Sequence, residues 1–446
     1  MPQADDRFTG AKFSSGRSPG PATSCVPGPP ACKLLAQEPR AAIVHRHEET
    51  DHGPDLAPTD AHACAPQGRD GIDTAGPQAR AIEDLFEPLR VIGKGSFGLV
   101  VLARERATAQ LRAVKVLSRA FVAVRNQEKH TVSERAALSA IRSPFVVRIH
   151  EAFRSRRSLY IVTDYASGGD LYTHLTRQRL SEPQVRFFLA QIAVGLHHCH
   201  DKGVVYRDLK PENVLVDSEG YVKLADFGLC RLGVHRCTSG ATSFCGTPEY
   251  LAPEVLDRTG HGFAADWWTL GMLAYEMFTG LPPWFTEDRR ELYRRRREDP
   301  LTFPQGCRAG AAARSLIRAL LQRDAASRLG TRGGGRAGGA VDVLGHPFFG
   351  TMLGVPALVE SLVNRTVASP LRSFIHGEDD VSNADPALAG MPPSFSAASF
   401  HLQAQQYAEA KLAKGQTPRQ PRASFSDFDW LPQDSDDAGG GHSADG

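Results

Sequence analysis

The chain has 446 residues, of which 41% are hydrophobic, so it can hold more than one domain of average size and bury a sizeable core. Its formal net charge of +2 gives no reason to propose a nucleic-acid partner. The eight cysteines are irregularly spaced and include no C-x-x-C pair, which favours reduced thiols over a disulfide framework.

The first 84 residues are expected to form a disordered leader. They are rich in Pro, Gly, Ala, Ser and His, and their apolar residues follow no period, so they cannot bury enough surface to offset chain entropy. Their His and Cys residues lack the paired spacing of a zinc site. Neither an apolar signal segment nor a membrane-spanning run of about 18 apolar residues is present. We therefore expect a soluble protein of the cytoplasm that can also enter the nucleus.

Three strand-like apolar runs follow once ordered structure begins near Ile82. They cover residues 89–92, 99–103 and 111–117. Between the first two lies Gly93-Lys94-Gly95-Ser96-Phe97-Gly98-Leu99-Val100, which matches G-x-G-x-x-G-x-V. Dinucleotide-binding folds share this glycine spacing, but there the last glycine opens a helix, whereas here it leads into a strand. The pattern favours a glycine-rich hairpin that brings backbone N–H groups close to phosphates.

Lys115 lies in the third apolar run, where an unpaired cation would be costly. The partners that a glycine-rich phosphate loop predicts for it are the ATP phosphates and a glutamate on a neighbouring helix. The helical stretch 127–141 offers Glu134 and Glu128. We prefer Glu134 because it lies in the middle of that stretch, one turn before the apolar Leu138.

From Ser181 the pattern is helical. Ser181 and Gln184 form a capping box, the apolar residues between Val185 and Leu196 share one face, and Gly203 fits the end of the helix. A strand-rich first part and a helix-rich second part predict two lobes around one cleft. After residue 349 the chain becomes a polar extension with isolated aromatic residues.

The strongest chemical signal is the run Tyr206-Arg207-Asp208-Leu209-Lys210-Pro211-Glu212-Asn213, followed by Asp226-Phe227-Gly228. Phosphoryl transfer from ATP needs one carboxylate that orients the attacking hydroxyl and a cation that meets the γ-phosphate. It also needs an amide and a second carboxylate that hold magnesium. The two motifs together predict a protein kinase that uses ATP and Mg²⁺.

With these motifs the chain resembles the eukaryotic protein kinases, and specifically the AGC group of cAMP-dependent protein kinase and protein kinase C. The further markers are Ser243-Phe244-Cys245-Gly246-Thr247-Pro248-Glu249-Tyr250, Ala252-Pro253-Glu254, Asp266-Trp267-Trp268 and Phe425-Ser426-Asp427-Phe428-Asp429-Trp430. The resemblance implies an α+β bilobal fold with a β-rich small lobe, a helical large lobe and an extended C-terminal tail. It implies a kinase domain over residues 85–349, an AGC-type extension over 350–430 and a disordered tail over 431–446.

The resemblance also implies roles for single residues. Asp208 would orient the substrate hydroxyl and accept its proton, and Lys210 would neutralise charge on the γ-phosphate. Asn213 and Asp226 would hold magnesium. ATP would be bound by Ile92, Gly93, Lys94, Gly95, Ser96, Phe97, Gly98, Val100, Ala113, Lys115, Glu134, Asp164, Ala166, Asp170 and Leu215.

Structural contacts follow from the same resemblance. Thr247 would hydrogen-bond to Asp208, and Glu254 would pair with Arg328 to brace the large lobe. Residues 164 to 166 would form the adenine hinge behind Thr163. An apolar spine that is complete only in the active state would consist of Leu138, Ile149, Tyr206 and Phe227.

Arg207 predicts control by phosphorylation, because an arginine beside a catalytic carboxylate needs an anion as its partner. Ser243 is the aligned phosphosite, and Thr242 beside it is the alternative. His130, Arg207 and Arg231 are the matching phosphate-binding residues. An upstream activating kinase is therefore an expected partner.

Three acidic residues indicate protein substrates with basic residues near the target Ser or Thr. Asp170, Glu212 and Glu276 match the family's positions that meet arginines upstream of the target, and carboxylates pair with arginine in a bidentate manner. Asp170 is also placed to meet the ATP ribose. Ordinary helix-surface charge is the alternative interpretation for Asp170 and Glu276.

The end of the chain resembles the hydrophobic motif that docks on the small lobe beside the Glu134 helix. Phe425, Phe428 and Trp430 are its aromatic residues, and Asp429 occupies the usual phosphosite, where it would imitate phosphate permanently. A disordered tail with stray aromatic residues is the competing interpretation.

Other tail segments match less well. Residues 380–385 resemble the family's active-site tether, although Ala384 stands where an aromatic residue would pack over the nucleotide. Thr417 and Ser424 are candidates for a further phosphosite.

Two other classes of protein fit parts of the sequence. A pseudokinase scaffold would bind ATP or partners without turnover, but such proteins usually lack one of Lys115, Asp208 and Asp226, and all three are present. A tyrosine kinase is disfavoured by Lys210, because a cation two residues after the aspartate marks the Ser/Thr enzymes of the family.

Two clusters have a plain structural interpretation that we prefer. The arginines between residues 289 and 297 alternate with acidic residues, which favours a solvated helix face over a nuclear signal. Cys230 and Cys245 flank the predicted activation loop, and we expect packed thiols rather than redox-sensitive ones.

Overall fold

The structure is a computed structural model of the chain, and it describes residues 81–95, 97–332, 339–350, 354–371, 376–377, 379–413, 425 and 428–432. The predicted leader up to residue 80, Ser96, the candidate phosphosites Thr417 and Ser424, and the chain from residue 433 onward lie outside the described residues.

Five antiparallel strands form the sheet of the small lobe in the order β1-β2-β3-β5-β4. Each of the three predicted strand runs is confirmed, because each lies inside β1, β2 or β3. Val101 and Val114 are fully buried, so the sheet supports a core of its own. The strands are β1 (Phe86–Lys94), β2 (Gly98–Glu105), β3 (Leu111–Ser118), β4 (Ile149–Arg154) and β5 (Ser158–Asp164).

Three helices belong to the small lobe, and the last of them confirms the helix predicted over residues 127–141. Leu138 and Ile141 turn into the core, and the Glu134 side chain is buried on the same helix. The helices are α1 (Ile82–Leu85), α2 (Arg119–Val124) and α3 (Glu128–Ala140).

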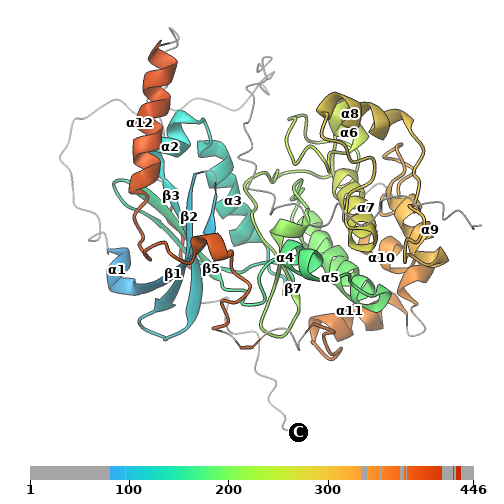
Figure 1. Cartoon of the computed structure of the whole chain (residues 1–446), viewed down its shortest axis with the longest axis horizontal. Helices are drawn as coiled ribbons and strands as arrows, with labels where there is room; N and C mark the ends of the chain where they lie inside the picture. The colour runs from blue at the N-terminus through green and yellow to red at the C-terminus, as the bar shows by residue number, and fades with distance from the viewer. Residues whose placement is uncertain are drawn as a thin grey trace, which may run out of the picture. The chain divides into compact units, whose positions relative to one another are not determined.

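The large lobe is mainly helical, and α7 lies at its centre, with every residue from Ala264 to Phe278 buried (Figure 1). The capping box predicted at the start of α5 is confirmed, because Ser181 N donates to Gln184 Oε1 at 2.8 Å. Its elements are α4 (Leu171–Arg177), α5 (Glu182–Asp201), η1 (Pro211–Asn213), β6 (Val214–Val216), β7 (Val222–Leu224), α6 (Pro253–Leu256), α7 (Ala264–Thr279), α8 (Arg289–Glu298), α9 (Ala311–Leu320), α10 (Gly339–Leu344), η2 (Pro347–Phe349) and α11 (Val355–Val363).

A buried ion pair braces the large lobe at the predicted place. Arg328 Nη1 and Nη2 donate to Glu254 Oε1 and Oε2 at 2.7 and 2.9 Å, and the guanidinium is fully buried. Such a pair withstands burial because each charge is compensated and the contact is bidentate.

Over the ranges described above, no helix is long and apolar enough to cross a membrane.

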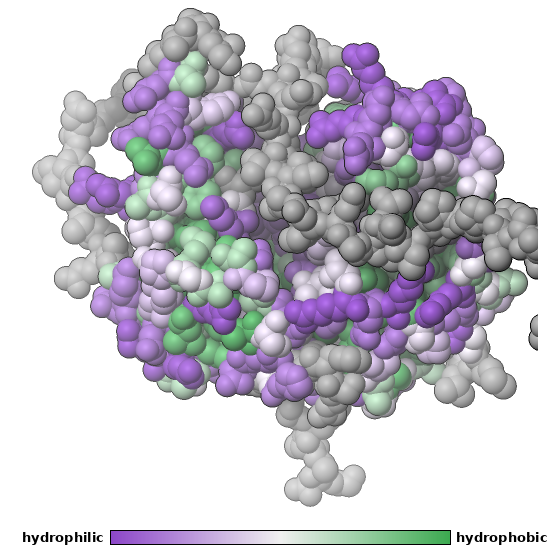
Figure 2. Space-filling model, viewed as in Figure 1, coloured by the Kyte–Doolittle hydropathy of each residue, from purple (hydrophilic) through white to green (hydrophobic). Residues whose placement is uncertain are grey.

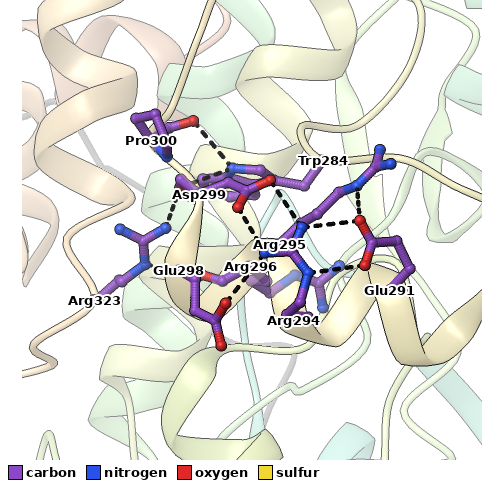
Figure 3. Close-up of polar contacts among 9 residues, drawn as sticks. All are labelled: Trp284, Glu291, Arg294, Arg295, Arg296, Glu298, Asp299, Pro300 and Arg323. Carbon is purple, nitrogen blue, oxygen red and sulfur yellow. Dashed lines mark hydrogen bonds and ion pairs between the residues drawn. The ribbon is translucent and has the colours of Figure 1, made fainter.

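Helix α8 is only partly the solvated face that its alternating charges predicted. Arg294 and Arg295 pair with Glu291 at 2.8 and 2.7 Å and remain 44% and 37% exposed (Figure 3). Arg296 contradicts the prediction, because it is fully buried. It follows the buried Leu292 by four residues, so the helical period turns both side chains to the inner face.

The C-terminal extension returns to the small lobe and adds η4 (Pro386–Leu388) and α12 (Ala398–Ala413). Helix α12 packs against α2, and Figure 1 shows the two side by side. The Phe400 and Phe121 ring centroids are 6.1 Å apart, and His401 Nδ1 lies 2.8 Å from Ser118 Oγ. The face seen in Figure 2 is mostly hydrophilic, with smaller apolar areas between the charged groups. The sequence did not predict α12.

His261 is a buried titratable group next to a small cavity that is also lined by Arg207, Cys245 and Thr247. Its backbone pairs with Ala241 in both directions, at 2.8 and 2.9 Å, but its side-chain Nε2 has no hydrogen-bond partner among the described residues. Burial lowers the pKa of His261 to about 4, and the positive charge of Arg207 acts in the same direction.

We predict that His261 makes the fold less stable as the pH falls from 6.5 toward 4. In this window the unfolded chain binds a proton at His261 and the folded chain does not, so protonation favours unfolding. The pKa change corresponds to roughly 3 kcal/mol in the free energy of unfolding. Urea unfolding of wild type and His261→Gln between pH 7.5 and 4.5 measures the effect. The variant should lose less stability than wild type, and parallel pH curves would contradict the prediction.

Candidate active site

Lys115 on β3 meets carboxylates from both lobes. Its Nζ lies 2.6 Å from Glu134 Oε1 on α3 and 3.1 Å from Asp226 Oδ1 in the loop after β7. Glu134 is thus the partner, as preferred over Glu128. Burial alone would lower the pKa of Lys115, but the charges of Asp226 and Glu134 outweigh it and raise the pKa above its ordinary value. The lysine therefore stays charged at neutral pH.

The glycine-rich sequence forms the hairpin between β1 and β2, as predicted. Gly95 N donates to Gly98 O at 2.9 Å, and Gly93 pairs with Val100 across the two strands. Gly98 has a packing reason that the sequence did not reveal. A Cβ at this position would lie 1.8 Å from the carbonyl oxygen of Val116 on β3, so no side chain fits.

Other residues predicted to bind ATP lie on β1 and β3, in the hairpin, at and after the end of β5, and on β6. Ala113 on β3 pairs with Thr163 on β5. The Asp164 carboxylate that follows is occupied by His150 Nε2 at 2.7 Å and Lys223 Nζ at 2.8 Å. Further along, Asp170 and Leu215 form an isolated β-bridge, Ala166 is buried, and Ile92 and Phe97 are half-buried.

Asp208 precedes η1 and is held from three sides. Asn213 Nδ2 donates to Oδ2 at 2.9 Å, Thr247 Oγ1 donates to Oδ1 at 2.6 Å, and Lys210 Nζ lies 3.2 Å from Oδ2. The predicted contact of Thr247 with Asp208 is therefore present. Burial alone would lower the pKa of Lys210, but Asp208 and Glu212 raise it overall. The orientation of the carboxylate is fixed before any substrate arrives.

Asp226 lies in the loop after β7, and its side chain is 53% exposed. Its φ of +53° is unusual for a residue with a side chain and stores strain at this point. The charge of Lys115 is the main cause that holds the pKa of Asp226 below its ordinary value. The ionised carboxylate is therefore available to a cation.

Asp266 holds the backbone of the residues just before Asp208, a role that we had not predicted from the sequence. Its fully buried carboxylate accepts the backbone N–H of Tyr206 at 2.9 Å and that of Arg207 at 2.8 Å, and lies 2.8 Å from His200 Nε2. The available signal was a carboxylate inside the apolar stretch that forms α7, ten residues before the other one, Glu276. A buried charge of that kind requires several hydrogen bonds.

Two members of the predicted apolar spine, Tyr206 and Phe227, are in ring contact. The rings of Tyr206 and Phe227 are 4.9 Å apart at 65°, and the Tyr206 hydroxyl donates to the carbonyl oxygen of Ala225. Leu138 and Ile149 are buried in the same core cluster.

Arg207 reaches the predicted phosphosite. Its Nη1 donates to Ser243 Oγ at 2.6 Å, and its Nε donates to the carbonyl oxygen of Leu229 at 2.6 Å. His130 Nδ1 lies 2.7 Å from Gln127 Oε1, and the side chain of Arg231 is exposed. Of the thiols near this loop, Cys230 is buried, and burial raises its pKa to about 12, while Cys245 is half-buried.

The three acidic residues differ in environment. Glu212 is exposed, but the surrounding protein removes part of its hydration, which raises its pKa. The negative charges of Asp170 and Asp208 raise this pKa further. Asp170 begins α4 and accepts from Thr173 N at 2.7 Å, which is a capping role that we had not predicted. Glu276 is only 8% exposed and accepts from the Tyr250 hydroxyl, so it is no surface charge.

The tether segment contacts the hinge without an aromatic residue. Arg177 Nη1 donates to Asn383 Oδ1 at 2.6 Å, and the Tyr165 hydroxyl donates to the carbonyl oxygen of Asp380 at 2.6 Å. The side chain of Asn383 is buried and its Nδ2 donates to Ser167 O at 3.4 Å. Asn383, next to Ala384, thus fixes the segment to residues of the large lobe through side-chain hydrogen bonds.

The hydrophobic motif docks on β4. Trp430 and Ala152 exchange two backbone hydrogen bonds, at 2.7 and 3.0 Å. Phe425 and Phe428 are buried in the core cluster that also contains residues of α3, and Asp429 Oδ2 lies 3.3 Å from Arg154 Nε. The competing interpretation of stray aromatic residues is wrong for these positions.

Comparisons with known proteins agree with this geometry. Residues 86–349 match the family model described as a protein kinase domain. The RAC family serine/threonine-protein kinase homolog of Dictyostelium discoideum is 40% identical over 314 residues, which are 70% of this chain and 67% of that protein. The serine/threonine-protein kinase Sgk1 of Gallus gallus is 41% identical over 69% of this chain and 68% of its own. The serine/threonine-protein kinase gad8 of Schizosaccharomyces pombe is 40% identical over 72% of this chain, but the match spans 54% of its length.

Proposed function

The chain belongs to the protein kinase family as an AGC-type serine/threonine kinase, and we propose that it phosphorylates proteins at Arg-rich sites under two controls. The controls are phosphorylation of Ser243 and docking of the C-terminal hydrophobic motif. The observation that carries the proposal is the position of Asp208, fixed by Asn213 and Thr247. A pseudokinase scaffold would not need a carboxylate oriented in this way.

In the proposed reaction a substrate hydroxyl attacks the γ-phosphorus of ATP. The bond between the γ-phosphorus and the bridging oxygen breaks, ADP leaves, and the hydroxyl proton passes to Asp208. Lys210, 3.2 Å from Asp208 Oδ2, would meet the negative charge of the transferred group. Lys115 would hold the remaining phosphates, and the Lys115–Glu134 contact keeps it in place.

Mg²⁺ is the metal ion that the donor set fits. The Asn213 nitrogen is used by Asp208, which leaves the amide oxygen as an acceptor, and the Asp226 carboxylate is half exposed. Hard oxygen ligands in small number, completed by phosphates and water, suit Mg²⁺ better than softer metals. Bound there, Mg²⁺ would supply charge neutralisation on the phosphate groups.

Charge supports the proposed choice of substrate. The carboxylates of Asp170 and Asp208 both raise the pKa of Glu212, so these groups lie close enough to repel one another. A guanidinium from an incoming peptide would relieve that repulsion and can bind a carboxylate through two hydrogen bonds. Asp170 is also available to the ATP ribose. Glu276 accepts a hydrogen bond from Tyr250, so a substrate arginine that binds Glu276 would also affect Tyr250.

Two contacts support the proposed controls. Arg207 already donates to the Ser243 hydroxyl, so a phosphate on Ser243 would meet the positive charge of Arg207, next to Asp208. His130 and Arg231 would be further phosphate ligands. At the tail, the side chains of Phe425 and Phe428 share a core with α3, which carries Glu134. The cysteines in the described segments are free thiols, which supports a cytoplasmic or nuclear location.

We predict that Glu212→Gln selectively weakens phosphorylation of Arg-rich peptides. Loss of one charge-assisted pair should lower kcat/KM about tenfold or more for such a peptide and leave a matched peptide with Ala in place of Arg nearly unchanged. Initial rates with labelled ATP measure this, with Asp208→Asn as the background. Glu360→Gln on α11 removes an exposed carboxylate as a control. Equal losses with both peptides would argue against a role in substrate choice.

Phosphorylation of Ser243 should be required for full activity. Ser243→Ala removes the group that would bring a phosphate to Arg207, and turnover should fall about tenfold or more. Protein whose activation-loop phosphorylation is verified by mass spectrometry provides the reference. Thr242→Ala is the matched control and should keep its activity. The reverse result would move the phosphosite to Thr242.

Phe428→Ala should undock the tail and reduce activity. Truncation of a fully buried phenylalanine costs about 3–5 kcal/mol, enough to release a short segment. Peptide turnover should fall and hydrogen exchange in α3 should rise. Leu431→Ala, at a side chain that is 65% exposed, is the control and should change neither. Full activity of Phe428→Ala would remove the docking role of the motif.

A further inference from the structure

Arg296 is a buried cation without an acidic partner. Three charged side chains of the described residues are fully buried, namely Asp266, Arg296 and Arg328. Arg328 pairs with Glu254, and Asp266 accepts backbone N–H groups and contacts His200. Arg296 makes no ion pair with any carboxylate in the described ranges. Burial lowers its pKa only to about 10, so it is charged at neutral pH.

The Arg296 guanidinium instead binds three backbone carbonyl groups that belong to one turn, residues 248–251. Nη1 donates to the carbonyl oxygens of Pro248 at 2.8 Å and Leu251 at 2.9 Å, and Nη2 donates to that of Glu249 at 2.8 Å. These carbonyls belong to the turn that directly follows Thr247. A planar guanidinium can fix three acceptors in one geometry, which neither a lysine nor an apolar side chain can do.

The turn held by Arg296 connects to the reactive groups at both ends. Thr247 donates to the catalytic Asp208 at 2.6 Å and accepts from Lys210 Nζ at 3.2 Å. At the other end, the Tyr250 hydroxyl donates to Glu276. A shift of residues 248–251 would displace Tyr250, whereas Thr247 is also held by Asp208 and Lys210.

Helix α8 gives the arginine a rigid base. The carbonyl oxygen of Arg296 accepts from Arg323 Nε at 2.8 Å, and Arg297 Nε lies 2.6 Å from Asp257 Oδ1, just after α6. Trp284 Nε1 donates to the carbonyl oxygen of Asp299 at 3.2 Å at the end of the helix (Figure 3). The backbone around Arg296 is thus held by contacts on two sides of the helix.

We propose that Arg296 is a positioning residue for peptide phosphorylation, which holds residues 248–251 so that Tyr250 keeps its contact with Glu276, one of the carboxylates proposed to meet substrate arginines. The inference rests on the proposed function, because it assigns a determinant of peptide phosphorylation. It distinguishes Arg296 from the other arginines of α8, whose contacts are with exposed carboxylates.

The test compares Arg296→Met and Arg296→Lys with the matched control Arg295→Met. The control removes a guanidinium that is 37% exposed and paired with Glu291, so it should behave as wild type. For Arg296→Met we expect kcat/KM for an Arg-rich peptide to fall about tenfold or more, since small displacements near reacting groups are costly. KM for ATP and the slow hydrolysis of ATP without peptide should stay within about twofold. Arg296→Lys should lie between the two.

Unfolding temperatures are measured on the same samples, and if Arg296→Met does not fold, Arg296→Lys carries the test. A purely structural role would lower peptide phosphorylation and peptide-independent hydrolysis in parallel, and that result overturns the proposal. So would unchanged peptide kinetics in both Arg296 variants. Wild-type protein that fails to phosphorylate any peptide would instead refute the proposed function.

Discussion

The ionic contact of Lys115 with Glu134 and Asp226 is the constraint on which the site depends. It joins β3 of the sheet, helix α3 and the loop after β7. A buried ion costs several kcal/mol, on the order of the stability of a small domain, unless opposite charges compensate it. The contact therefore favours this arrangement of the three elements. A shift of α3 would remove one of the two carboxylates and leave the phosphate-binding cation without a fixed place.

The other side of the site is fixed by backbone contacts. Arg207 and Asp226 have φ values of +71° and +53°, and such conformations cost about 1–3 kcal/mol each for residues with side chains. Asp266 offsets this at Arg207 by accepting its N–H, and Lys115 holds Asp226. Strain and its compensation thus occur at the same residues. This is expected where side chains must point in directions that a relaxed backbone would not give.

Local chemistry was predictable from the sequence, and of the contacts between distant segments only those that the family resemblance implied, such as Glu254 with Arg328, were predicted. The glycine-rich hairpin and the Lys115–Glu134 pair follow from spacing and period, which a linear pattern contains. Asp266 and Asn383 act on residues far away in the chain, so no local pattern marks them. Arg296 is an instructive intermediate case. Its charge indicated solvent, but its place four residues after the buried Leu292 indicated the inner face, and the helical period decided the outcome.

The C-terminal tail shows which force holds its aromatic residues in place. Asp429 pairs with Arg154, and its side chain is 50% exposed. Solvent-exposed ion pairs contribute about 0–1 kcal/mol to stability. Phe425 and Phe428 are almost fully buried, and each such side chain contributes about 1.5–3 kcal/mol. Apolar burial therefore provides most of the affinity, together with the backbone pairing of Trp430 on β4. The charge of Asp429 therefore only adjusts a contact that the two phenylalanines already secure.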